Sequence, residues 1–332
     1  MVQIAGSSLR GPAMHLMLLG GTGFAGRALI RQLQRERGTD ITVVSRTTYA
    51  MPGVRRVVTG DYRDLVAGAA FRREMRAVDA LVHLGDGLSV LQHRGETGNA
   101  ARADRLVAAA ADLASAVREA QVPLFVYVSS IKALCDEEDG RVLAEDSEPR
   151  GSTLYGRSKL RVEQSVSSVL SESATRHVIL RIPVMYGEGG TGSFQRLLKL
   201  ADTPLPLPLD GLRNRRSVLA TRNFASLLAL VLRTGPPHPH GVFHVHDGPP
   251  WSTTRIVTTL RAALGRPRRL FGVGEVFGHA FRRAPFVGPI ARRLYGSLEL
   301  SDARLRRSFA WTAVVDTQAA LFELARNSRA PP

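Results

Sequence analysis

The chain has 332 residues, of which 44% are hydrophobic and 22% charged, which is enough for one large globular domain or a large domain with a smaller one. This composition excludes a disordered or fibrous chain, and the lack of a run of eighteen apolar residues argues against a membrane span. The formal net charge is +16, but only three of the 45 basic residues are Lys and the Arg residues are scattered. We therefore expect no nucleic-acid partner.

The cysteine count and the first residues of the chain bear on the cellular compartment. Cys135 is the only cysteine, which excludes an intramolecular disulfide, and residues 1–12 lack the apolar core of a signal peptide. We expect a cytoplasmic protein without stable membrane insertion. The nine histidines show no metal-ligand pairing with carboxylates, so no metal site is predicted.

From residue 14 onward, short apolar runs alternate with helical stretches, which is the pattern of βαβ units around a parallel sheet. The expected strands are 15–19, 41–45, 56–59, 80–84, 124–128 and 177–182, and the expected helices are 24–37, 100–120 and 155–171.

This pattern predicts an α/β fold, a Rossmann-type doubly wound parallel sheet of at least six strands. The sheet domain should cover residues 14–186, with later segments returning to it. Pro and Gly become dense after residue 187, so residues 187–328 are expected to form mainly a smaller α+β region that caps a substrate. Residues 1–13 show no periodicity and are expected to be disordered.

The first chemical signal is the glycine-rich turn Gly20-Gly-Thr-Gly-Phe-Ala-Gly26, which lies between the first expected strand and the first expected helix. Gly20 permits a tight turn, Gly23 lets the backbone approach a pyrophosphate at the helix N-terminus, and Gly26 lets the helix pack on the strand. The turn therefore predicts a dinucleotide site.

Two side chains at strand ends bear on which dinucleotide binds. Arg46 follows the second strand, where an NAD-selective site usually carries an acidic residue, and a guanidinium can pair with a 2′-phosphate. Asp61 follows the third strand and could accept a hydrogen bond from the adenine amino group, with a turn at the strand end as its alternative role. We expect NADP(H) to be favoured, with NAD as the open alternative.

The strongest signal is the set Ser130, Tyr155 and Lys159. Tyr155 and Lys159 are four residues apart on one helix, so they share a face, and Ser130 follows the fifth expected strand. A phenol of pKa about 10 is a poor acid–base group at neutral pH unless a cation favours its phenolate, and Lys159 would supply that charge while bonding the nicotinamide ribose. Ser130 would hydrogen-bond the reacting oxygen. We predict that all three are catalytic.

With these motifs, the chain after Met14 resembles an extended short-chain dehydrogenase/reductase of the NAD-dependent epimerase/dehydratase family, which includes UDP-galactose 4-epimerase. The resemblance implies a UDP-sugar substrate, with a homodimer as an open alternative. Arg216 lies where such enzymes place an Arg on the substrate diphosphate, and Arg292, in an expected lid, is a further candidate. Beyond the glycine turn, Arg46, Asp61 and Lys159, the resemblance implies cofactor contacts at Phe24, Leu84, Gly85, Asn99, Ser129 and Pro183.

Departures from the family pattern reduce the number of reactions that we expect of this chain. Epimerases usually carry Asn where Val184 stands. They also carry Ala-Ala or Ala-Gly after the His of the fourth strand, where this chain has Gly85-Asp86. The dehydratases need an Asp-Glu pair where this chain has Ile131-Lys132, which argues against a 4,6-dehydratase because no carboxylate is there to remove a proton.

Three functions stay open. The run Ser129-Ser-Ile-Lys resembles a polysaccharide-biosynthesis subgroup of UDP-sugar 4-epimerases and of reductases of 4-keto-6-deoxy UDP-sugars. Arg46 favours the reductase, with Tyr155 as the acid, over a UDP-hexose 4-epimerase that uses bound NAD. The third function is a non-catalytic NAD(P)-binding protein, which an intact Ser130, Tyr155 and Lys159 disfavours.

Overall fold

The computed structural model describes residues 13–46, 52–85, 99–136, 140–190, 192–235, 239–272 and 294–329. Its main sheet has seven strands in the order β10-β7-β5-β4-β1-β2-β3, and every neighbouring pair is parallel. The strands are β1 (Met14–Leu19), β2 (Thr39–Ser45), β3 (Arg56–Thr59), β4 (Ala80–His83), β5 (Leu124–Ser130), β7 (Arg176–Ile182) and β10 (Gly241–His244).

The strand order runs outward from β1 in both directions, which confirms the doubly wound Rossmann-type fold. The central strands are apolar throughout because both of their faces are covered: Leu16 to Leu19 are at most 1% exposed. The prediction ended the fifth strand at Val128. β5 runs on to Ser130 because it stays paired with β7 up to Ser130 opposite Ile182.

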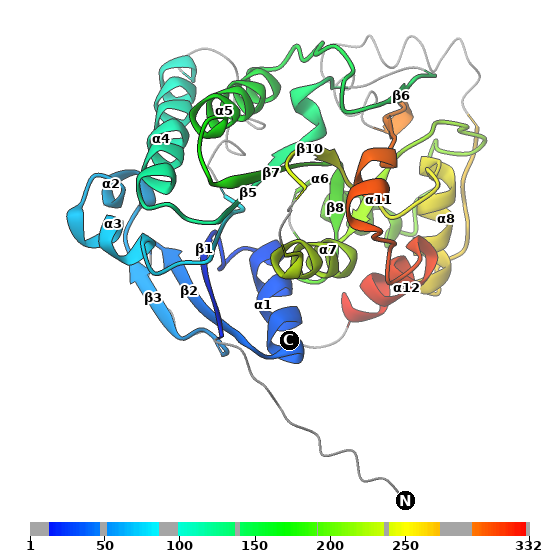
Figure 1. Ribbon diagram of the computed structural model, residues 1–332. Coiled ribbons are helices and arrows are strands. Elements are labelled where there is room, and N and C mark those ends of the chain that lie inside the picture. Colours follow the sequence, from blue (N-terminus) through cyan, green and yellow to red (C-terminus); the bar gives the residue numbers. More distant parts are fainter. Residues whose placement is uncertain are drawn as a thin grey trace, which may run out of the picture.

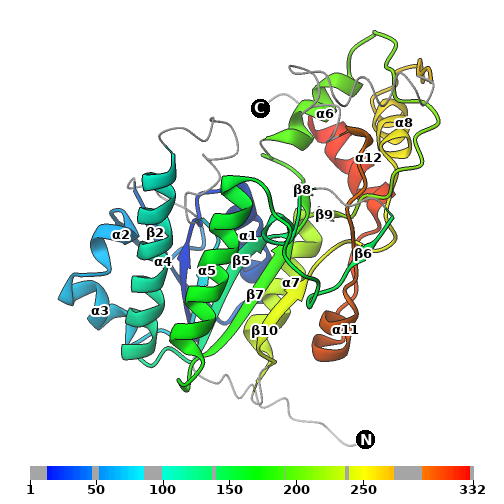
Figure 2. The same cartoon turned by 90° about the horizontal axis from the view of Figure 1, so that it is seen from above.

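Helices cover both faces of the sheet (Figures 1 and 2). On one face, α4 (Ala100–Glu119) packs beside α5 (Leu154–Leu170) and shares a buried cluster with alternate residues of the strands. On the other face, α1 (Phe24–Glu36) packs beside α7 (Thr221–Arg233). Two short helices, α2 (Tyr62–Leu65) and α3 (Ala69–Met75), follow β3.

A second group of elements forms its own buried cluster at one end of the molecule, where Figure 2 shows α6, α8 and α12 together. The small parallel pair β8–β9 contributes to this cluster, whereas a second parallel pair, β6–β11, packs in a separate cluster with Ile131 of η2, the short helical turn after β5. These remaining elements are η2 (Ile131–Ala133), β6 (Val142–Leu143), β8 (Val184–Tyr186), α6 (Ser193–Ala201), β9 (Val218–Ala220), α8 (Thr253–Ala263), β11 (Glu299–Leu300), α11 (Ala303–Phe309) and α12 (Thr317–Asn327).

Two segments from the second half of the chain return to the main sheet. β10 adds the seventh strand beside β7, and α7 lies against α1. The placement of the domain boundary at residue 186 remains a prediction. Within the described ranges, every helix falls short of the length and apolar character that crossing a membrane requires.

Candidate active site

The predicted site residues follow strands that end at one edge of the sheet. Gly20 follows β1, Leu84 follows β4, Ser130 closes β5 and Pro183 follows β7. The carboxyl ends of parallel strands lie on the same side, and in doubly wound sheets ligands bind outside this edge. The fold therefore brings these four residues, which are up to 163 positions apart in the sequence, to one edge of the sheet.

Backbone packs directly on backbone in the glycine turn. Gly20 has φ +86°, and a Cβ there would lie 3.1 Å from the amide nitrogen of Gly85, so the turn after β1 touches the loop after β4. A Cβ on Gly26 would lie 2.5 Å from the carbonyl oxygen of Gly20, so only glycine fits there. Gly23 caps α1 without a side-chain hydrogen bond. A helix N-terminus at the open sheet edge, held by glycines, fits a dinucleotide pyrophosphate.

Arg46 and Asp61 lie at the ends of adjacent strands, β2 and β3. The Asp61 carboxylate caps α2 and accepts hydrogen bonds from the Arg63 backbone and guanidinium. The Arg63 hydrogen bond and, to a smaller extent, the charge of Arg46 lower the pKa of Asp61. The turn role considered for Asp61 is therefore present, and its contact with adenine remains a prediction. Arg46 is exposed beside it.

Tyr155 and Lys159 lie on the buried face of α5, at 7% and 5% exposure. Gly156 explains how this helix reaches the end of β5: a Cβ there would lie 2.3 Å from the Lys132 carbonyl oxygen. The first turn of α5 thus packs on the backbone just past Ser130. The hydroxyl of Ser130 accepts a hydrogen bond from the Lys132 amide at 3.3 Å. The spacing that indicated one shared helix face holds in three dimensions.

Lys159 is held by the strand beneath it. Its Nζ donates to the Val128 carbonyl at 3.0 Å and to the Tyr127 hydroxyl at 3.2 Å. Both acceptors belong to β5, the strand that ends at Ser130. Tyr127 was not among the predicted site residues, because an aromatic residue in a buried strand is typical of core packing.

A buried ion pair lies one helical turn beyond Lys159. Arg181 on β7 donates to Glu163 on α5 through Nε and Nη2 over 2.7 to 3.1 Å, and neither side chain is more than 6% exposed. Ser129 donates its hydroxyl to the same carboxylate. Breaking such a pair costs about 3–5 kcal/mol, so it ties α5 firmly to β5 and β7. The Ser129 hydroxyl proton is therefore used within this pair, and a cofactor contact of Ser129 remains a prediction.

A signal for this ion pair was present in the sequence. Glu163 lies four residues after Lys159 on the same predicted helix face, and a carboxylate on a buried face needs a charged partner. Its partner Arg181 lies in an apolar strand segment, where a lone Arg is equally unusual.

The start of α5 is fixed by Thr153 and Asp136. Thr153 caps the helix by accepting from the Gly156 amide at 3.2 Å, and Asp136 accepts from the backbone and hydroxyls of Ser152 and Thr153. Burial raises the pKa of Asp136, but these hydrogen bonds and the charge of Lys132, 3.6 Å away, outweigh it and lower that pKa. Lys132 thus supports the helix that carries Tyr155.

On the predicted substrate side, Arg216 donates to the Gly296 carbonyl at 2.7 Å, and its backbone pairs with Trp251. Its neighbour Arg215 is paired with Glu299. Arg292 and Asp86 lie outside the described residues.

The other predicted cofactor contacts have these places. Phe24 opens α1 and is half-buried, Asn99 directly precedes α4, and Pro183 is buried between β7 and β8. The Cβ of Leu84 would lie 3.3 Å from a Cβ on Gly20. Their roles toward the cofactor remain predictions.

The sequence profile of the NAD-dependent epimerase/dehydratase family matches residues 16–245, more than half of the chain. This protein belongs to that family. As predicted, it is an enzyme of the extended short-chain dehydrogenase/reductase type. The matched range ends just past β10, so the family pattern includes the strand that returns to the sheet.

Relatives and solved structures agree with this assignment. A UDP-glucose 4-epimerase of Vibrio cholerae is 25% identical over 310 residues, 89% of this chain and 90% of its own length. The fold matches a UDP-N-acetylglucosamine 4-epimerase from Bacillus cereus with a TM-score of 0.74 and 19% identity, over 96% of this chain and all of that one. It also matches the human epimerase family protein SDR39U1 with NADPH, with a TM-score of 0.70 and 22% identity, over 95% and 100% of the two chains.

The family takes a nicotinamide dinucleotide, and the fold provides the parts that such a cofactor needs. The glycine turn suits its pyrophosphate, and the contact of Lys159 with its nicotinamide ribose remains a prediction. Among the described residues, no cluster of His, Cys, Asp and Glu has the arrangement of a metal site.

Proposed function

We propose that this protein is an NAD(P)-dependent oxidoreductase acting at C4 of a UDP-sugar, with Tyr155 as the acid–base group. The observation that carries the proposal is the joint placement of Tyr155 and Lys159 on the buried face of α5, whose first turn packs on the backbone after Ser130. When bound, the nicotinamide ring supplies or accepts the hydride.

Each residue then has one task. Ser130 donates a hydrogen bond to the C4 oxygen and keeps it beside the Tyr155 phenol. Tyr155 gives that oxygen a proton in reduction and takes one from it in oxidation. The Lys159 ammonium favours the phenolate through its charge, in a setting where few waters screen it.

The UDP-sugar class is supported by the Vibrio cholerae relative, named a UDP-glucose 4-epimerase, which aligns over nine-tenths of its length. Arg216 supports it as well, because a planar guanidinium suits a diphosphate and this one lies in the second half of the chain, beyond the six strands predicted to build the dinucleotide site. We propose Arg216 as the diphosphate contact and Arg292 as a second one.

Two forms of the C4 reaction each rest on a specific observation. Arg46, exposed beside Asp61 at the predicted ribose position, favours NADPH and hence net reduction of a 4-keto UDP-sugar. The Vibrio cholerae relative favours 4-epimerisation, in which the hydride removed from C4 returns to the other face and NAD is regenerated. Both forms use the same three residues.

The test begins with the nucleotide that co-purifies with the protein. The protein is then incubated separately with UDP-glucose, with UDP-N-acetylglucosamine, and with a 4-keto-6-deoxy UDP-sugar plus NADPH. Stoichiometric oxidation of NADPH would establish the reductase, and equilibration of C4 isomers with no net cofactor change would establish the epimerase. If neither occurs with cofactor bound, the C4 proposal is rejected. Tyr155→Phe is the matched inactive control.

A further inference from the structure

We propose that Tyr127 is a positioning residue for Lys159: its phenol oxygen receives the ammonium and holds it at the Ser130 end of β5. The inference rests on the role proposed above for Lys159. It adds a second tyrosine to the site, one that acts through the lysine and not on the substrate.

The geometry holds Lys159 at two consecutive residues of one strand. Its Nζ lies 3.2 Å from the Tyr127 hydroxyl and 3.0 Å from the Val128 carbonyl oxygen, and 4.9 Å from the centroid of the Tyr127 ring. The ring therefore attracts the charge while the hydroxyl fixes its direction. Because β5 ends at Ser130, this places the ammonium relative to the serine hydroxyl.

Burial makes these contacts matter. Tyr127 is 0% exposed and belongs to the apolar cluster between the sheet and the α4–α5 layer, where an ammonium is costly unless acceptors replace its water. One helical turn further along α5, the Glu163 carboxylate accepts from the Arg181 guanidinium and the Ser129 hydroxyl. The His83 ring lies 5.7 Å from the Tyr127 ring, and the Tyr62 ring lies 4.9 Å from that of His83.

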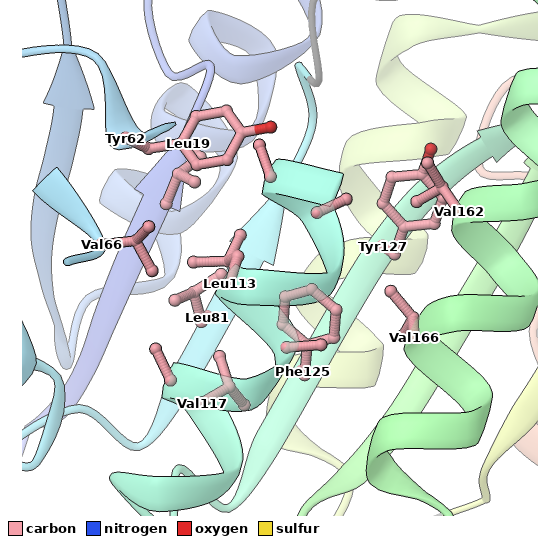
Figure 3. Packing of buried hydrophobic residues seen from close by; sticks show 14 of the residues in the cluster. Leu19, Tyr62, Val66, Leu81, Leu113, Val117, Phe125, Tyr127, Val162 and Val166 are labelled. Carbon is pink, nitrogen blue, oxygen red and sulfur yellow. The ribbon is translucent and has the colours of Figure 1, made fainter. Parts of the chain in front are cut away.

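Packing alone does not require a hydroxyl at this position. Phe125 lies two residues earlier on the same face of β5, in the same cluster and equally buried. Figure 3 shows Phe125 and Tyr127 in line along the strand, with Val162 and Val166 of α5 beside them. The feature that distinguishes Tyr127 from Phe125 is the oxygen that meets Lys159.

Tyr127→Phe keeps the ring and removes that oxygen, so it isolates the proposed role. The chain has three lysines, at 132, 159 and 199, so NMR of selectively isotope-labelled lysine gives three side-chain signals, and Lys159→Met assigns the one in question. In Tyr127→Phe we expect the Lys159 signal to titrate about one pH unit lower, because the buried ammonium has lost an acceptor. The Lys132 and Lys199 signals should not move.

Kinetics supply the second readout. We expect Tyr127→Phe to lower kcat about tenfold or more and to move the pH–rate profile, while the KM for the UDP-sugar stays the same. Tyr62→Phe, another buried phenol in the same cluster, is the matched control and should change neither readout. A loss of stability alone would lower the amount of folded enzyme without moving the titration.

If the Tyr127→Phe variant fails to fold, the tyrosine signals of the Lys159→Met variant test the same contact. In tyrosine-labelled protein, which has six tyrosines, Lys159→Met should shift the Tyr127 ring signal and leave that of Tyr62 in place. An unchanged Lys159 titration in a folded Tyr127→Phe variant, or an unmoved Tyr127 signal in Lys159→Met, overturns the proposal. These signals are measured without substrate. A failure of the Tyr127 proposal can therefore be distinguished from a failure of the proposed C4 reaction.

Discussion

Lys159 carries the positive charge on which the proposed chemistry depends, and it is nearly as buried as a core valine. A buried ammonium persists only when acceptors replace the lost water, and here the strand beneath supplies a carbonyl and a phenol oxygen. Glu163, four residues further along α5, forms a buried ion pair with Arg181. The same helix face thus carries two buried charged groups, one paired with Arg181 of β7 and one hydrogen-bonded to β5.

Tyr155→Phe should abolish the chemical step while leaving the fold and the cofactor affinity intact, because only the transferred proton is lost. We expect kcat to fall by about 10²–10⁴-fold, the usual worth of a positioned acid–base group. Steady-state rates on the substrate identified above, with cofactor Kd measured by fluorescence, check this. Activity retained above about one-hundredth of wild type contradicts an acid–base role.

Arg46→Asp should reverse a preference for NADP toward NAD, because it replaces a partner of the 2′-phosphate with an acceptor for the ribose hydroxyls. Separate Kd measurements for the two dinucleotides give the selectivity. Arg73→Asp is the matched control, since it makes the same charge change at an exposed position of α3, away from the sheet edge. Equal selectivity in wild type and Arg46→Asp would show that Arg46 has no contact with the cofactor.

In the turn before β9, two neighbouring arginines have different hydrogen-bond partners. Arg215 is bound to Glu299, whereas Arg216 turns inward and donates to the Gly296 carbonyl. Asn214 fixes this arrangement because its amide binds Thr253 and the carbonyls of Leu294 and Gly296. Asn214 therefore links the turn to the start of α8 and to the chain before β11.

Arg216→Ala should raise the KM for the UDP-sugar roughly ten- to a hundredfold, because a charge-assisted phosphate contact is worth about 1.5–3 kcal/mol. The cofactor Kd should not change. Arg215→Ala, which removes an adjacent guanidinium bound to Glu299, is the control and should leave KM near wild type. If cofactor affinity falls instead, Arg216 contacts the dinucleotide, and if nothing changes, its bond to Gly296 is its whole role.

Asp247 joins the main sheet to the smaller group of elements. It follows β10 by three residues, its amide binds the Val218 carbonyl of β9, and its carboxylate accepts from the Ala220 amide, Asn223 and Tyr186. Burial raises the pKa of Asp247 to about 6, although its hydrogen bonds oppose the shift. One carboxylate thus links β8, β9 and α7 to the end of the seventh strand.

This raised pKa makes stability depend on pH in a definite direction. The folded protein holds the Asp247 proton more tightly than the unfolded chain, so its contribution is fully present below pH 4 and is lost as pH rises through about 6. We expect the unfolding free energy of wild type, relative to Asp247→Asn, to fall by about 2 kcal/mol between pH 4 and pH 7. Chemical denaturation of both proteins at several pH values measures this difference, and a pH-independent difference contradicts it.

The sequence by itself determined the features that depend on neighbouring residues. Apolar runs and helical periodicity predicted six strands of the sheet. The glycine turn was recognisable because its three glycines lie within seven residues, at the spacing that a tight turn and the approach of a pyrophosphate require. Tyr155 and Lys159 were placed on one face because helical geometry relates positions four apart wherever the helix lies.

Only the tertiary structure decided which distant groups meet. The sequence predicted at least six strands and later segments that return to the sheet, but not which segment adds the seventh strand, because Gly241–His244 is short and pairs with β7, more than sixty residues earlier. The Tyr127–Lys159 contact spans 32 residues, and Ser129 and Glu163 are 34 apart. Periodicity carries no information on such pairs, since they form only where strand order and helix packing bring buried polar groups close enough to satisfy one another.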